Sequence, residues 1–117
     1  MSIARGEIYF VELGPTIGME IDDKRRPVLV LSINYLNARP LVVSVVPGTS
    51  AKDKSVRFMN EVLVPPTSTN GLLCSTIFKC HQLRALDHSR FTTPPAGRLA
   101  PKHLRLVEDA VRFCLGL

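Results

Sequence analysis

Three polar segments lie where apolar runs of this sequence begin or end, and they are the first candidates for chemistry. A charged loop with Glu20 follows Gly14-Pro15, Arg26-Pro27 opens one apolar run, and Pro47-Gly48-Thr49-Ser50 follows another. An arginine fork and a hydroxyl donor at such ends suit the binding of a phosphate group. The same residues also fit an ordinary exposed arginine and a threonine that bonds its own backbone in a turn. No GxSxG, Walker loop, HExxH or paired Cys and His ligand set is present.

The elements that must position these segments are short strands. Apolar and β-branched runs predict strands over 6–13, 26–33 and 40–46, the last of them halted by Pro47-Gly48. Further strands are predicted over 55–59 and 61–64, as one strand or a pair, and over 72–74 and 76–83. Residues 14–25 are predicted to form a mobile loop, 34–39 a short polar connection and 87–100 an irregular stretch.

The last segment changes to a helical period. Pro101 suits a first helical turn and Gly116 a C-cap. Between them one helical face carries the apolar side chains of Leu104, Val107, Val111, Cys114 and Leu115. The sequence therefore predicts five to seven short strands closed by a C-terminal helix, in a small barrel or curled sheet.

Composition limits the classes of protein that fit. The chain has 117 residues, 45% of them hydrophobic, which suits one domain with a real core and excludes a disordered tail. A net charge of +5 makes a polyanionic partner plausible. No apolar run approaches the roughly 20 residues that span a bilayer, and the N-terminus does not resemble a signal peptide. Three cysteines without a CxxC pair or a fourth ligand predict no disulfide framework and no zinc site, and favour a reducing cytoplasm. No cofactor is expected.

A set of short segments is specific when taken in order. They are Arg5-Gly6-Glu7-Ile8-Tyr9, Pro15-Thr16-x-Gly18-x-Glu20, Arg26-Pro27-Val28-Leu29-Val30, Val46-Pro47-x-Thr49-Ser50, Gly71-Leu72, Lys79-Cys80-His81-Gln82-Leu83-Arg84, Leu86-Asp87 and Leu115-Gly116-Leu117. In this order and spacing the sequence resembles the MazF/PemK/Kid family of toxin endoribonucleases. The resemblance runs from residue 5 to residue 117, so we expect one MazF/PemK-like domain over 1–117.

The resemblance implies a fold, an activity and partners. The expected fold is mainly β with helices, a small curled SH3-like or CcdB-like barrel with a C-terminal helix, acting as a homodimer. The expected activity is sequence-selective, metal-independent cleavage of single-stranded RNA through the ribose 2′-hydroxyl, leaving 2′,3′-cyclic phosphate and 5′-hydroxyl ends. The expected inhibitor is a cognate MazE/PemI-like antitoxin with an acidic tail.

The resemblance also assigns roles to three residues. Arg26 would stabilise the charge that builds on the non-bridging phosphate oxygens, since a guanidinium stays charged at every working pH. Thr49 would donate to the phosphate or position the 2′-hydroxyl. Glu20 would orient Arg26 or take a proton, although a solvated loop carboxylate fits the sequence equally well.

The sequence departs from the family at His81. The plasmid-toxin branch carries Arg-Cys-Asp-Gln where this chain has Lys79-Cys80-His81-Gln82. If the roles persist, His81 replaces the aspartate as general base, because imidazole has an ordinary pKa of about 6.5. Lys79 then becomes a phosphate contact. A strand histidine bonded to a neighbour remains the structural alternative.

Other polar residues near these positions are predicted to bind RNA. They are Arg25, Ser50, Lys79, Gln82 and Arg84. The segment 84–105 carries a local excess of positive charge that would hold RNA backbone or an antitoxin tail, or form a solvated face. His88 and His103 are predicted to be surface residues, and the cysteines to be small buried hydrophobes.

Two further functions stay open. A CcdB-like protein would bind DNA gyrase without cleaving anything, mainly through the end of its C-terminal helix, and would not need Arg26 or Thr49. A plain nucleic-acid-binding barrel would stack bases on exposed aromatic side chains. The sequence has five Phe and two Tyr, and most of them occupy strand positions typical of a core.

Overall fold

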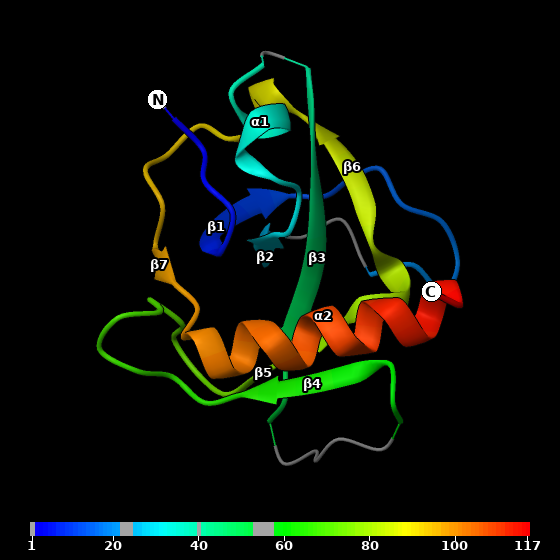
Figure 1. Cartoon of the computed structure of the whole chain (residues 1–117). Coiled ribbons are helices and arrows are strands. Elements are labelled where there is room, and N and C mark those ends of the chain that lie inside the picture. The colour runs from blue at the N-terminus through cyan, green and yellow to red at the C-terminus, as the bar shows by residue number, and fades with distance from the viewer. Residues whose placement is uncertain (1, 22–24, 40, 53–57) are drawn as a thin grey trace.

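The computed structural model describes residues 2–21, 25–39, 41–52 and 58–117 as a curled antiparallel sheet crossed by one long helix (Figure 1). The strands are β1 (Glu7–Glu12), β2 (Arg25–Val30), β3 (Val42–Ser50), β4 (Glu61–Val64), β5 (Thr76–Lys79), β6 (Arg84–Asp87) and β7 (Gly97–Arg98). The helices are α1 (Asn34–Asn37) and α2 (Pro101–Leu115), with single 3₁₀ turns at η1 (Cys80–Gln82) and η2 (His88–Arg90). The predicted fold class, a mainly β curled barrel with a C-terminal helix, is confirmed.

Strand β3 joins the two halves of the sheet. The strand order is β4-β5-β3-β2-β1-β7, and β6 pairs with the first half of β3. The prediction that Pro47-Gly48 ends this strand is wrong, because β3 continues to Ser50. Pro47 is tolerated because β3 changes partners here: β6 pairs with residues 42–45 and β5 with residues 48–50. A residue without an N–H therefore lies between two ladders.

Gly48 allows the close approach of β3 to β5. A Cβ at Gly48 would lie 2.7 Å from Cγ2 of Thr76 and 3.1 Å from the ring of Phe78, and both neighbours are buried. Since neither neighbour has room to move, only glycine fits at this crossing. The crossing sends Thr49 and Ser50 on to the end of the sheet.

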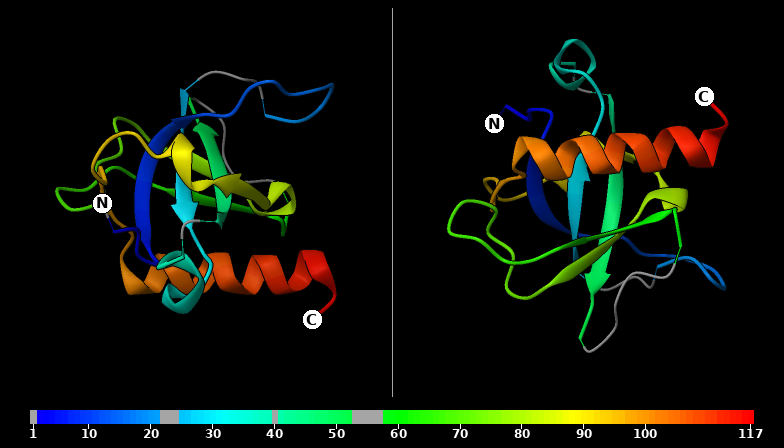
Figure 2. Two further views of the ribbon diagram at one scale, coloured as in Figure 1. Left: turned by 90° about the horizontal axis from the view of Figure 1, so that it is seen from above. Right: turned by 60° about the horizontal axis from the view of Figure 1, so that its bottom comes forward.

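The continuous apolar runs are explained by burial of both faces of the sheet. One core lies between the sheet and α2 and includes Ile8, Leu29, Val46, Phe78, Val107 and Val111. The neighbouring positions on the same strands point the other way and form a second core that includes Tyr9, Val28, Val45, Leu86 and Phe91. The two further views show α2 lying across one face only (Figure 2).

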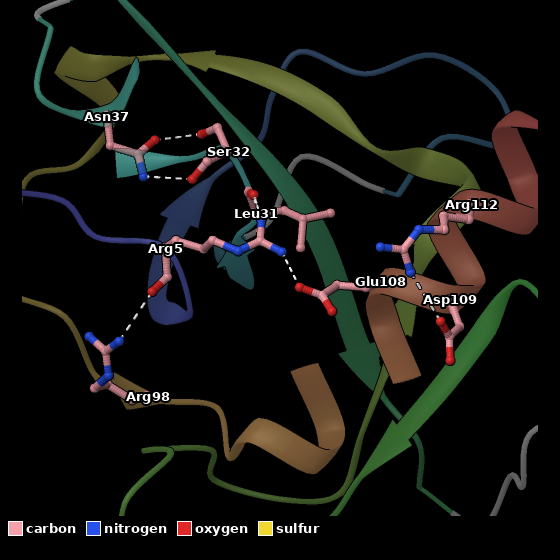
Figure 3. Close-up of polar contacts among 8 residues, drawn as sticks. All are labelled: Arg5, Leu31, Ser32, Asn37, Arg98, Glu108, Asp109 and Arg112. Atoms are coloured by element: carbon pink, nitrogen blue, oxygen red, sulfur yellow. Dashed lines mark hydrogen bonds and ion pairs between the residues drawn. The ribbon is translucent and has the colours of Figure 1, made fainter. Parts of the chain in front are cut away.

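Helix α2 begins and ends as the sequence predicts. Pro101 is its first residue, and Gly116 caps it in the left-handed region with a φ of 71°. Leu115, predicted on the packed face, is instead exposed. The helix is tied to the N-terminus by Arg5, whose guanidinium donates to the carbonyl of Leu31 and forms an ion pair with Glu108 (Figure 3).

Several local predictions differ from the structure. Residues 34–39 contain the helix α1, and 76–83 divide into β5 and η1 because the chain turns at Cys80 before β6 begins. Residues 72–74 form no strand, and Phe58 and Met59 lie in a turn rather than a strand. Arg25 belongs to β2 rather than to the loop before it. The remaining predictions for 22–24 and 55–57 fall outside the described residues.

Over the described part of the chain, no helix is long and apolar enough to cross a membrane.

Candidate active site

The ends of β2 and β3 bring two of the predicted catalytic residues to one place. The β2–β3 ladder ends at the pair Val28–Pro47, and Arg26 and Thr49 each lie two residues beyond this pair, at the same end of the two antiparallel strands. Both residues are half-buried. Beyond Pro47, β3 pairs with β5, where Thr49 lies opposite Ile77, while Arg26 pairs with Val11 of β1.

A hollow of about 510 Å³ lies beside η1, which packs against β3. Its lining residues come from the loop after β1 and from the η1–β6 segment, and they are Met19, Glu20, His81, Gln82, Leu83 and Arg84. Two predicted catalytic residues, Glu20 and His81, thus share one hollow. Arg26 and Thr49 are not among the described residues that line it.

Gln82 and Glu20 are both bonded to the backbone of the loop. Gln82 accepts at Oε1 from the N–H of Ile21 at 2.7 Å, and its Nε2 donates to the carbonyl of Met19 at 3.4 Å. Glu20 accepts at Oε1 from the N–H of Ile17 at 2.6 Å. The side-chain amide of Gln82, predicted to bind RNA, is therefore engaged within the protein.

His81 and Lys79 both have partners on the β4 side of the site. Nδ1 of His81 lies 2.6 Å from Nδ2 of Asn60, a neighbour that sequence reasoning missed because nothing in the pattern links the two positions. Lys79 forms an ion pair with Glu61 across the β4–β5 ladder, with 2.6 Å between Nζ and Oε2. Since the Glu61 side chain is only 8% exposed, this lysine neutralises a buried carboxylate.

Two arginines of the predicted basic segment hold the root of the loop, whereas Arg98, Lys102 and Arg105 are exposed. Arg84 donates to the carbonyl of Leu13 at 3.4 Å, and Arg90 donates to the carbonyls of Glu12 and Gly14 at 2.9 and 3.1 Å. Guanidinium N–H groups of both arginines thus donate to backbone carbonyls at and just after the end of β1.

Arg25 and Ser50 lie on the margins of the site. Arg25 lies opposite Glu12 in the β1–β2 ladder. It lines a separate hollow of about 350 Å³ with Arg90 and Thr92. Its neighbour Arg26 belongs to the opposite face, as strand alternation predicts. Ser50 accepts a weak hydrogen bond from Sγ of Cys74 at 3.5 Å.

The cysteines do not behave alike. Burial, with a smaller contribution from Cys114, raises the pKa of the Cys80 thiol to about 12. Cys114 is half-buried, but Cys74 is exposed, so the prediction of three buried cysteines is wrong for Cys74. Throughout the described parts of the chain, no three His, Cys, Asp or Glu side chains gather as a metal site would require.

The other two histidines are half-buried rather than surface residues. Nε2 of His88 lies 3.2 Å from the carbonyl oxygen of Asn37. Burial, followed by the charge of Lys102, lowers the pKa of His103. Neither histidine lines the hollow of Glu20 and His81.

Comparison with known proteins decides the family. The family model for the PemK-like, MazF-like toxin of type II toxin–antitoxin systems matches residues 4–115. The chain belongs to this family. It is similar to endoribonuclease MazF9 of Mycobacterium tuberculosis, with 33% identity over 97% of this chain and 96% of the relative. It is also similar to endoribonuclease EndoA of Bacillus subtilis, with 26% identity over 100% of this chain and 97% of the relative. The predicted family and enzyme class are confirmed.

Solved structures of MazF proteins share the fold. MazF from Deinococcus radiodurans matches with a TM-score of 0.81 and 23% identity, over 100% of this chain and 99% of that one. A mycobacterial endoribonuclease in complex with its cognate antitoxin matches with a TM-score of 0.77 and 20% identity, over 99% of this chain and 97% of that one. The MazF curled barrel therefore extends over the whole of this chain.

Proposed function

We propose that this protein is the toxin of a toxin–antitoxin pair and acts as a sequence-selective, metal-independent endoribonuclease on single-stranded RNA in the cytoplasm. The whole chain, 1–117, acts as one MazF/PemK-like domain. The observation that carries the proposal is that Glu20 and His81 share one hollow, while Arg26 and Thr49 lie at the same end of the antiparallel strands β2 and β3. The endoribonuclease names of the relatives support the substrate class.

The reaction is an attack by the ribose 2′-oxygen on the adjacent phosphorus. A bond forms between the 2′-oxygen and phosphorus as the bond from phosphorus to the 5′-oxygen breaks, which leaves a 2′,3′-cyclic phosphate and a 5′-hydroxyl. Negative charge builds on the non-bridging oxygens during the attack. Arg26 stabilises that charge with two parallel donors, and the hydroxyl of Thr49 donates to the phosphate or orients the 2′-hydroxyl.

Two proton transfers accompany the attack, and His81 and Glu20 are the candidates for the base. As the structure places the amide, Nδ2 of Asn60 donates to Nδ1 of His81, so Nε2 of the neutral ring carries the proton and is a donor. Nε2 is a base only when the amide is turned so that its oxygen accepts from Nδ1–H. Glu20 has a second carboxylate oxygen besides the one that accepts from Ile17.

Two assemblies belong to the proposal. The protein forms a homodimer, and apolar side chains exposed near β4 and α2, including Met59, Leu106 and Phe113, offer surface for association. A cognate antitoxin with an acidic tail inhibits the protein, as the antitoxin complexes of similar structures suggest. Sedimentation that shows only monomer at micromolar concentration would count against the dimer.

One experiment tests the proposed activity. The purified protein is incubated with a mixed single-stranded RNA in excess EDTA, and the new ends are analysed. Cleavage with 2′,3′-cyclic phosphate and 5′-hydroxyl ends is expected. Intact RNA, together with gyrase trapped on DNA in a parallel assay, would favour the CcdB-like alternative. RNA that is bound but never cut would indicate a plain binding barrel; the exposed rings of Tyr35, Phe58 and Phe113 leave that outcome open.

A further inference from the structure

The side-chain amide of Gln82 brackets the backbone of Glu20. It accepts from the N–H of Ile21 on one side of Glu20 and donates to the carbonyl of Met19 on the other. In a parallel sheet, the C=O and N–H of one residue make this same pair of bonds with the two residues on either side of the facing residue in the next strand. One side chain thus supplies the hydrogen bonds of a missing strand to the loop that carries a candidate catalytic carboxylate.

Only an amide of this length satisfies both bonds. A carboxylate in its place keeps an acceptor for Ile21 but puts a second oxygen against the carbonyl of Met19, where a donor is needed. Asparagine is shorter by one methylene. The position thus favours glutamine for its shape and its two opposite polar groups.

The neighbouring contacts fix the loop on both sides of this bracket. Ile21 packs against the second core, and the root of the loop is held by Arg84 and Arg90 at the end of β1. The charged end of Glu20 remains exposed in the hollow with His81. The backbone of Glu20 is therefore set from the η1–β6–η2 segment, while its carboxylate stays accessible.

The geometry points to Gln82 as a positioning residue that acts through Glu20 by holding residues 19–21 over the hollow, and not as an RNA ligand. This inference rests on the proposed function for its catalytic consequence, but the hydrogen bonds themselves are independent of RNA. Gln82 keeps the Glu20 carboxylate at a fixed distance from the bound phosphate, so its loss lowers the rate of the chemical step more than the affinity for RNA.

The first arm of the test measures the loop without RNA. Amide hydrogen exchange is followed in full-length wild type, Gln82→Met and Gln82→Glu. In Gln82→Met the peptide that contains 19–21 should exchange about fivefold faster or more, because the N–H of Ile21 loses its acceptor, while α2 keeps its protection. Gln82→Glu keeps an acceptor for this N–H and should show a smaller increase. Unchanged exchange at 19–21 in Gln82→Met would overturn the inference whether or not the protein cleaves RNA.

The second arm measures kcat and KM for RNA cleavage in Gln82→Met, Glu20→Ala and the double variant. We expect Gln82→Met to lower kcat about tenfold with KM within about twofold of wild type, and the double variant to match Glu20→Ala. A raised KM with kcat preserved, or effects that simply add, would instead make Gln82 an RNA contact. If wild type does not cleave, the proposed function fails and the exchange arm still decides whether Gln82 holds the loop.

Discussion

The side-chain amide of Asn60 meets the imidazole of His81 with 2.6 Å between Nδ2 and Nδ1. Asn60 lies in the turn before β4 and His81 in η1, so the contact joins the small β4–β5 ladder to the rim of the hollow. A hydrogen bond at one ring nitrogen fixes the tautomer and therefore the role of the other. Whichever way the amide faces, Nε2 is the nitrogen left for RNA.

The pH profile of cleavage tests whether His81 is the base. The rate should rise with pH and level off as the imidazole loses its proton, and His81→Ala should flatten the rise and lower the plateau by about a hundredfold. Asn60→Asp should move the rise to higher pH, because a carboxylate at Nδ1 stabilises the imidazolium. His81→Asp should retain the activity that His81→Ala loses, and its cleavage rate should rise at a lower pH than that of wild type. A folded His81→Ala protein with an unchanged profile would end the hypothesis and leave Glu20 as the base.

The ion pair of Arg5 and Glu108 should contribute to stability. Both side chains are about a quarter exposed, and Arg5 also donates to the carbonyl of Leu31 (Figure 3). Glu108→Gln should lower the free energy of unfolding by about 1–2 kcal/mol, because the arginine stays half-buried without its carboxylate. Asp109→Asn is the matched control, since its pair with Arg112 is exposed and should change stability by less than about 0.5 kcal/mol. Urea unfolding measures both, and equal effects would contradict the account.

Thiol labelling should separate the cysteines. Cys74 is exposed, whereas Cys80 is buried with a pKa raised to about 12, so near neutral pH almost no Cys80 thiolate forms. A disulfide reagent should label Cys74 quickly, Cys114 more slowly and Cys80 only after unfolding. Mass spectrometry of digested, labelled protein assigns each site. Rapid labelling of Cys80 in the native protein would contradict the burial of its thiol.

Much of the fold could be predicted because its signals are local. Continuous apolar runs predicted β2 and β3, and the helical period with Pro101 and Gly116 predicted α2. The end of β3 could not be predicted, because Pro47 breaks a strand only where the ladder needs its N–H. That need depends on β5 and β6, which are distant in sequence.

The candidate site was predicted residue by residue but not as a network. Glu20 and His81 share a hollow, and Arg26 and Thr49 lie at the same end of β2 and β3 without lining it. The bonds from Gln82 to the loop and the ion pair of Lys79 come from tertiary contacts that no spacing reveals. Whether a polar side chain near the site can bind RNA or instead holds the protein together is therefore decided only when its hydrogen-bond and ion-pair partners are known.

The single-turnover cleavage rate of Arg26→Ala tests the central claim most directly. Wild type, Arg26→Ala and the adjacent control Arg25→Ala are compared on one RNA at saturating protein in EDTA. Arg26→Ala should lose about a hundredfold or more in rate while remaining folded and still binding its antitoxin, as expected when one preorganised charge stabiliser is removed. Arg25→Ala should weaken RNA affinity with little change in this rate. A folded Arg26→Ala protein that cleaves at nearly the wild-type rate would remove Arg26 from the mechanism and contradict the site as described.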